Sequence, residues 1–191
     1  MIAIRSKPQA LAQTPGPCPI IETNRLVLRP HRMSDADAIA SSLNDWQVVR
    51  MLARVPLPYS RDDAFDWLNT IRSGTLPDWC LAITEGDGVH IGCVSLEIRH
   101  GHWHLGYWLN RFYWGHGLMT EAVSAVIERF LRRMPQTDIH SGAFADNQAS
   151  LRIQEKLGFR IQRCSDIYSL SRSAMVPHLE TRLSAENFQR P

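Results

Sequence analysis

Two closely spaced glycines stand directly before a long amphipathic segment. Gly115 and Gly117 flank His116, and apolar residues at helical spacing begin at Leu118. Glycine permits backbone turns in which successive N–H groups point the same way, and a helix N-terminus adds its positive dipole end. Residues 115–120 therefore predict an anion site suited to a pyrophosphate, although a plain turn into a helix leaves the same pattern. The loop lacks the Gly-Lys-Ser/Thr of a Walker motif and the third glycine of a dinucleotide fingerprint.

A second group of polar residues lies at the start of another predicted helix. Asn147 precedes residues 148–157, and Ser150 follows three positions later, so both side chains can face the same side. Such a pair can bind a ligand. It can equally be an N-cap and an ordinary first-turn residue, because asparagine caps helices well.

Histidines supply the remaining candidate chemistry. His104 lies in a predicted strand, and an imidazole suits base catalysis near neutral pH. His100, His102 and His104 alternate, but Gly101 turns the chain and no carboxylate or thiolate stands beside them. We therefore expect no metal. The four cysteines show no CxxC spacing, which predicts free thiols in a reducing cytoplasm.

The elements that must position these residues follow from periodicity and turn signals. Strands are expected at 25–29, 79–84, 91–99, 102–109, 139–145, 160–168 and 175–183. Helices are expected from 34 to about 43, after the capping signal at 60–63, at 118–134 and at 148–157. Antiparallel strands followed by β-α-β-α predict an α/β fold of the α+β type, a mixed sheet flanked by helices.

Composition limits the functions that are open to the chain. Its 191 residues suit one domain, and the net charge of +2 is not clustered as a nucleic-acid binder requires. No apolar run is long enough to span a membrane, and no signal peptide is evident. Residues 1–19 are rich in proline and predict a flexible arm, followed by a folded domain at 20–185 and a tail at 186–191.

Five blocks in this order resemble the GNAT acetyltransferase superfamily. They are Gly106-Tyr107-Trp108-Leu109, the glycine loop, Thr120-Glu121-Ala122, Asp146-Asn147-Gln148-Ala149-Ser150 and Glu155-Lys156-Leu157-Gly158-Phe159. With the opening at residues 22–30, the pattern resembles the branch of ribosomal-protein N-terminal acetyltransferases of the RimJ/RimL type. The resemblance implies a mostly antiparallel sheet, splayed between its fourth and fifth strands, with acyl-CoA in the splay.

The resemblance also implies roles for individual residues. Those expected to contact acetyl-CoA are Tyr107, Trp108, Leu109, Trp114, Gly115, His116, Gly117, Leu118, Met119, Thr120, Asn147 and Ser150. The backbone of 107–109 should pair with pantetheine like an added strand. Met119 departs from the small residue that is common there, so its side chain must point away from the cofactor. Ser150 should lie near the thioester sulfur.

The pattern leaves two options for the group that takes the proton of the amine. His104 stands where the branch often has glutamate, which leaves His104 or a water chain to Glu121 or Glu97 as the proton acceptor.

The expected activity is transfer of an acetyl group from acetyl-CoA to a primary amine, either a protein N-terminus or a small molecule. The alternative is a catalytically weak acyl-CoA-binding module, because the glutamate is missing. We expect no nucleic-acid or membrane partner, and a homodimer is left open. An aromatic rim for the acceptor is expected from Trp46, Met51, Pro56, Leu57, Pro58, Tyr59 and Trp67, with Trp103, Trp108 and Tyr113 nearer the site.

Overall fold

The computed structural model describes residues 14–73, 78–86 and 88–191. One eight-stranded sheet runs through the molecule in the order β1-β2-β3-β4-β5-β6-β8-β7. All neighbouring strands are antiparallel except β5 and β6, which are parallel. The strands are β1 (Ile21–Glu22), β2 (Val27–Pro30), β3 (Trp79–Thr84), β4 (His90–Arg99), β5 (His102–Leu109), β6 (Ile139–Phe144), β7 (Arg160–Ser169) and β8 (Ala174–Leu183). The α+β class expected from the sequence is therefore confirmed.

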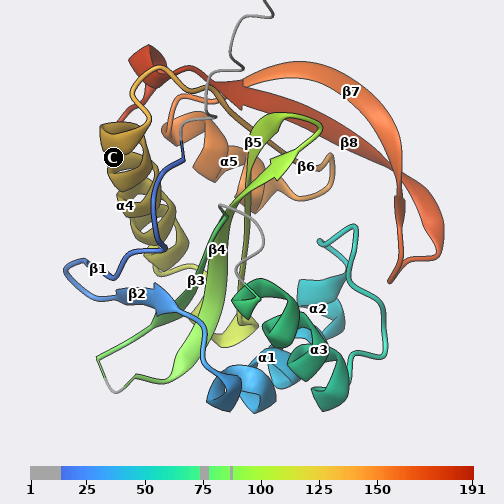
Figure 1. The fold of residues 1–191 in the computed structure, drawn as a ribbon. Coiled ribbons are helices and arrows are strands. Elements are labelled where there is room, and N and C mark those ends of the chain that lie inside the picture. Colours follow the sequence, from blue (N-terminus) through green and yellow to red (C-terminus); the bar gives the residue numbers. More distant parts are fainter. Residues whose placement is uncertain (1–13, 74–77, 87) are drawn as a thin grey trace, which may run out of the picture.

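Helices cover both faces of the sheet (Figure 1). They are α1 (Ala36–Leu43), α2 (Trp46–Val49), α3 (Arg61–Arg72), α4 (Leu118–Arg133) and α5 (Gln148–Lys156), with short 3-10 turns at Met33–Asp35, Arg111–Tyr113 and Ala185–Asn187. Alternate strand residues such as Leu81 and Ile83 are fully buried in the main core, together with the apolar stripe of α4. A smaller core joins α1 and α3 and also contacts Trp108.

The parallel strands β5 and β6 separate soon after they begin. Their ladder holds only Trp103 opposite Ile139 and His104 opposite His140. Ser141 Oγ then donates a hydrogen bond of 3.0 Å to the Leu105 carbonyl. Beyond that point no strand among the described residues pairs with β5 on the β6 side. Counted from β2, these are the fourth and fifth strands, so the expected splay is present.

The sequence pattern misses the shortest elements. The helix α2 has four residues, too few to show a helical period, and begins where Asp45 accepts a hydrogen bond of 2.8 Å from Gln47 N. The strand β1 has only two residues. Elsewhere the expected strands and helices are confirmed within about two residues at each end, the usual uncertainty of boundaries.

Both chain ends pack further than the expected domain boundaries. Residues 1–13 of the predicted arm lie outside the described residues, but 14–19 run along β3 and α4. Trp79 Nε1 donates to the Gly16 carbonyl at 2.9 Å, and Arg133 donates to the Pro15 carbonyl at 2.6 Å. At the other end Gln189 N donates to the Leu157 carbonyl at 3.1 Å. Packing against the domain thus begins before residue 20 and continues beyond residue 185. The domain boundaries at residues 20 and 185 remain predictions.

Candidate active site

The loop between β5 and α4 presents backbone N–H groups to solvent. Gly115 has φ 81° and Gly117, the N-cap of α4, has φ 74°. This left-handed region suits glycine and is costly for other residues. Gly115, His116 and Gly117 are exposed, and no backbone N–H from residue 115 to 120 donates a hydrogen bond within the described part of the chain. Six N–H groups at a helix N-terminus therefore remain available to an anion.

Neighbouring side chains hold this loop in place. Trp114 Nε1 donates to the Leu109 carbonyl at 2.8 Å, and Arg25 Nη1 donates to the His116 carbonyl at 2.8 Å. Arg25 Nε also donates to Glu121 at 2.7 Å, and Thr23 Oγ1 donates to the same carboxylate at 2.6 Å. Glu121 thus fastens the β1–β2 segment to α4. It does not line the cleft described below, which argues against it as a proton acceptor.

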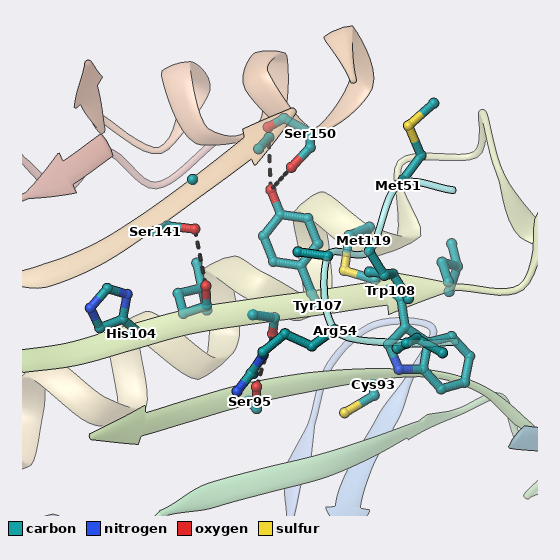
Figure 2. A pocket seen from close by; sticks show the side chains of 18 of the residues that line it. Met51, Arg54, Cys93, Ser95, His104, Tyr107, Trp108, Met119, Ser141 and Ser150 are labelled. Carbon is teal, nitrogen blue, oxygen red and sulfur yellow. Dashed lines mark hydrogen bonds between the residues drawn. The ribbon is translucent and has the colours of Figure 1, made fainter. Parts of the chain in front are cut away.

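The first residues of α4 belong both to the main core and to the wall of the cleft. Leu118 and Met119 are 5% and 7% exposed and pack in the main core, and Thr120 is half-buried. All three also line the cleft, and Figure 2 shows Met119 among the lining side chains. The expectation that the Met119 side chain points away from a cofactor therefore stays a prediction.

A cleft of about 2130 Å³ connects the glycine loop, the gap between β5 and β6, the start of α5 and the side of α1 and α3. Pockets for single small ligands are typically ~300–1,000 Å³. This cleft therefore has room for two substrates. Figure 2 shows residues that line it from β4, β5, β6 and α5.

A network of hydroxyl and amide groups crosses the gap between β5 and α5. Tyr107 Oη and Ser150 Oγ lie 2.7 Å apart, and the Tyr107 hydroxyl also lies 3.2 Å from the Ser150 carbonyl, to which it can donate (Figure 2). Gln154 Nε2 donates to both hydroxyl oxygens at 3.3 Å, while its Oε1 accepts from Thr181 at 2.6 Å. Burial raises the pKa of Tyr107, so this phenol keeps its proton at neutral pH.

Asn147 is the N-cap of α5. Its Oδ1 accepts a hydrogen bond of 3.2 Å from Ser150 N, so the capping interpretation is confirmed. No described residue accepts a hydrogen bond from its Nδ2. The cap therefore uses only one end of the amide, and the other end can serve a ligand.

The opposite face of β5 carries His104, directly across from Glu97 on β4. Burial lowers the pKa of His104 to about 4, helped by Arg99, His140 and His102. Burial alone would raise the pKa of Glu97, but Arg99 and Arg54 together hold it below its usual value. At neutral pH this face therefore holds a neutral imidazole beside an ionised carboxylate that is paired with two guanidinium groups.

The two expected catalytic residues, His104 and Ser150, are not brought into contact. Tyr107, which contacts Ser150, is an odd number of positions from His104, and successive strand residues point to opposite faces. His104 also lies toward the paired end of β5, on the far side of Ser141 from Ser150 (Figure 2). Any chemistry that uses both must therefore act on different atoms of one substrate complex.

Several residues of the site have no signal in the sequence. Gln154 and Thr181 are polar residues buried by tertiary packing, and only the spacing of four between Ser150 and Gln154 on one helix face could have indicated the former. Of the expected aromatic rim, the cleft is lined by Met51, Pro56, Tyr59 and Trp67, but not by Trp46, Leu57 or Pro58. Trp108 and Tyr113 also line it, whereas Trp103 is buried against Phe130.

Comparisons with known proteins agree with this geometry. A family model described as an acetyltransferase (GNAT) domain matches residues 25–160. An uncharacterised N-acetyltransferase of Bacillus subtilis, YoaA, is 27% identical over 149 residues, which are 74% of this chain and 83% of that protein.

Two solved structures share the fold at low sequence identity. The ribosomal-protein-S5-alanine acetyltransferase of Vibrio fischeri superposes with a TM-score of 0.74 at 20% identity, covering 89% of this chain and 98% of that one. Mycobacterium smegmatis RimJ in complex with CoA-disulfide gives 0.70 at 19% identity, covering 84% and 82%. At these identities the two structures show the shared fold alone.

Among the described residues, no helix is long and apolar enough to cross a membrane.

Proposed function

We propose, from the premise that this chain belongs to the GNAT acetyltransferase family, that it transfers an acetyl group from acetyl-CoA to a primary amine by direct attack on the thioester. Membership of the family makes the chain an acetyltransferase. The choice of acetyl-CoA as donor is supported by one observation above others. Six backbone N–H groups at the N-terminus of α4 have no acceptor in the described part of the chain, and they lie beside an open gap in the sheet. An anionic, extended donor such as acetyl-CoA suits both features.

The donor would be held mainly by backbone groups. The N–H groups of residues 115–120 would bind its pyrophosphate. The edge of β5 at Tyr107, Trp108 and Leu109, which lacks a partner beyond the splay, would pair with pantetheine like an added strand. Asn147 Nδ2 would donate to the same arm. The Mycobacterium smegmatis neighbour was solved with CoA-disulfide, which supports a CoA-type ligand for this fold.

The hydroxyl network would act on the leaving group. When the amine attacks, the carbon–sulfur bond breaks and the sulfur leaves as a thiolate that needs a proton or a hydrogen bond. Ser150 Oγ accepts from Gln154 Nε2, which directs the proton of Ser150 toward Tyr107 or toward the gap. Ser150 is therefore the proposed donor to the sulfur, and Tyr107 the proton reserve behind it.

The amine must be neutral when it attacks, whereas the ordinary pKa is ~8 for an α-amine and ~10 for an amine of the lysine type, so either is largely protonated at pH 7. The groups on the acceptor side of β5 are His104 and Glu97. We propose that His104 takes the proton, directly or through water. Its low pKa keeps the imidazole neutral and able to accept, but makes it a weak base.

The proposed acceptor class is an α-amine at a peptide N-terminus. The motifs resemble those of the RimJ/RimL branch, and a structural neighbour is named as a ribosomal-protein alanine acetyltransferase. The cleft widens toward Met51, Tyr59 and Trp67, so an extended chain could enter from that side. This assignment rests on similarity to the branch and on the open cleft.

Turnover tests the proposal most simply. Thiol release from acetyl-CoA would be followed with a panel of peptides that differ in their first residue, together with polyamines and amino acids. The proposal expects amine-dependent release and an acetylated product by mass spectrometry. Tight binding of acetyl-CoA without release by any amine would instead favour the acyl-CoA-binding module.

A further inference from the structure

Three side chains that can bind a metal meet on the sheet face covered by α1 and α3. His31 follows β2, Cys80 lies on β3 and Cys93 lies on β4, so three adjacent strands contribute one ligand each. Their ligand atoms lie within 4.8 Å of one another. Within residues 14–73, 78–86 and 88–191, no other group of three or more His, Cys, Asp or Glu residues is placed this way.

The two sulfur atoms already have the separation that a shared ion requires. Cys80 Sγ and Cys93 Sγ are 3.7 Å apart. Two thiolates bound at ~2.3 Å to a tetrahedral zinc ion lie about 3.8 Å from each other. An ion could therefore enter between them without movement of β3 or β4.

His31 is buried without hydrogen-bond partners. Its side chain is 0% exposed, and neither ring nitrogen has a hydrogen-bond partner among the described residues. Buried imidazole nitrogens are normally satisfied, because an unpaired buried polar group costs roughly 1–3 kcal/mol. A bound cation would satisfy one of them.

The other nitrogen has a carboxylate nearby. His31 Nδ1 lies 3.9 Å from Asp35 Oδ2, beyond hydrogen-bond distance but on the side of that carboxylate, so Nε2 would be the nitrogen offered to an ion. Histidines that bind metals commonly donate their second N–H to a carboxylate. Asp35 is itself fixed by two hydrogen bonds of 2.8 and 2.9 Å from Arg29, so this neighbour is well positioned.

We propose that His31, Cys80 and Cys93 bind a zinc ion, with a fourth position open toward the cleft. One nitrogen and two sulfur ligands are the donor set that zinc prefers. Two thiolates neutralise the two charges of the ion, which suits a buried position. All three residues line the large cleft, which provides an entry path.

The ion would support the floor of the cleft rather than take part in acetyl transfer. Cys93 is paired across the sheet with Trp108, and Figure 2 shows the two side chains in the same part of the cleft. Binding would tie β2, β3 and β4 together below that ring. This site differs from the run of His100, His102 and His104, which is set aside as a metal site because Gly101 turns the chain there.

Cobalt(II) is a suitable probe because its complexes with thiolates are coloured. The full-length protein, reduced and freed of metal with a chelator, would be titrated with Co²⁺. We expect saturation at one equivalent with a thiolate-to-cobalt charge-transfer band, and loss of the band when Zn²⁺ is added. Cys80→Ser and Cys93→Ser should each abolish the charge-transfer band or weaken Co²⁺ binding by about 100-fold or more. Cys164→Ser, which removes an exposed cysteine elsewhere, is the matched control and should bind normally.

A melting experiment separates ligand loss from misfolding. Zn²⁺ should raise the melting temperature of the wild-type protein and of Cys164→Ser, but not that of folded His31→Gln or Cys93→Ala. The proposal is overturned if the wild-type protein shows no thiolate charge-transfer band, or if that band and the Zn²⁺ stabilisation persist in Cys80→Ser and Cys93→Ala. Either result would make the cluster an ordinary packing contact.

Discussion

The glycine loop at residues 115–120 and the hydroxyl network of Tyr107, Ser150, Gln154 and Thr181 are built in opposite ways. Both contribute to the same cleft, the loop through Gly115 and Gly117 and the network through Tyr107, Ser150 and Thr181. The loop offers backbone N–H groups that have no acceptor among the described residues. The network is satisfied within the protein by hydrogen bonds of 2.6 to 3.3 Å. The loop therefore gains its hydrogen bonds only when a ligand arrives, whereas the network exists before it.

This difference predicts which step each region controls. Groups that wait for a ligand contribute to its binding, while prearranged groups stabilise the transition state without reorganisation. Changes in the loop should thus act on the affinity for acetyl-CoA, and changes in the network should act on kcat. The following experiments test that distinction.

The largest effect on the affinity for acetyl-CoA is expected from Gly115→Val. A side chain at φ 81° strains the loop and moves its N–H groups, so the affinity for acetyl-CoA should fall by about 100-fold, the equivalent of one or two charge-assisted hydrogen bonds. Gly101→Val is the matched control, because Gly101 has φ 79° and an equally open surrounding but lies in the β4–β5 turn outside the cleft. Calorimetric titration would show the difference, and equal losses in both variants would contradict the role of the loop.

The largest effect on kcat is expected from Ser150→Ala. Without the hydroxyl beside Tyr107, kcat should fall by about 10- to 1000-fold with little change in the KM for acetyl-CoA. Ser124→Ala, which removes a buried serine hydroxyl on α4, is the control. Steady-state kinetics at saturating amine would decide. A Ser150→Ala enzyme at full speed would reduce Ser150 to a helix-start residue.

The Asn147 side chain combines a group that is already hydrogen-bonded within the protein with a group that has no acceptor among the described residues. Its Oδ1 caps α5, while Nδ2 has no acceptor among the described residues. Asn147→Asp keeps the cap and loses the donor, whereas Asn147→Ala loses both. Both variants should raise the KM for acetyl-CoA by about threefold to tenfold, but only alanine should also cost about 0.5–2 kcal/mol of stability. A normal KM in the aspartate variant would show that Asn147 is only a cap.

The smallest effect is expected from His104→Gln. The pKa of His104 is about 4, so the neutral, proton-accepting form is complete at pH 7 and is lost only as the pH falls through about 4. Wild-type kcat/KM should therefore show no inflection near neutral pH from this group. The variant should lose at most about tenfold, because so weak a base contributes little. An inflection near pH 6.5 that disappears in His104→Gln would contradict this environment, and an unchanged rate would assign proton removal to water.

The same pKa shift fixes the sign of a stability effect. In the unfolded chain His104 takes up a proton near its ordinary pKa of 6.5, but in the folded protein only near 4. Acid between these values therefore favours the unfolded state, and the melting temperature should fall as the pH decreases across that window. His104→Gln should remove part of this dependence, whereas the exposed His100 serves as a control position.

The comparison also explains how much the sequence could predict. The glycine loop is a local device, since Gly115 and Gly117 adopt positive φ within one turn of the helix they precede, and its position was predictable. The strands and long helices were likewise predictable. Apolar residues such as Leu81 in a strand and Val126 in a helix recur with the period of the element and mark the side that faces the core.

Features that depend on distant segments could not be predicted. Gln154 and Thr181 meet only because β8 lies beside β6 in the sheet order. The low pKa of His104 depends on Arg99 and His140, which β4 and β6 bring to it. Arg133 anchors the segment at Pro15 through a contact that the proline-rich composition did not suggest. In each case the partner is set by tertiary packing rather than by spacing along the chain.

The central claim is that the N–H groups of residues 115–120, which have no acceptor among the described residues, bind the pyrophosphate of a CoA donor. The most direct test compares the affinity of the wild-type protein for CoA with that for pantetheine, which lacks the pyrophosphate and the nucleotide, and repeats both titrations with Gly115→Val. The account predicts that CoA binds the wild-type protein much more tightly than pantetheine does, and that the substitution removes most of this difference. Equal affinities for the two ligands, or a difference that Gly115→Val leaves intact, would contradict it.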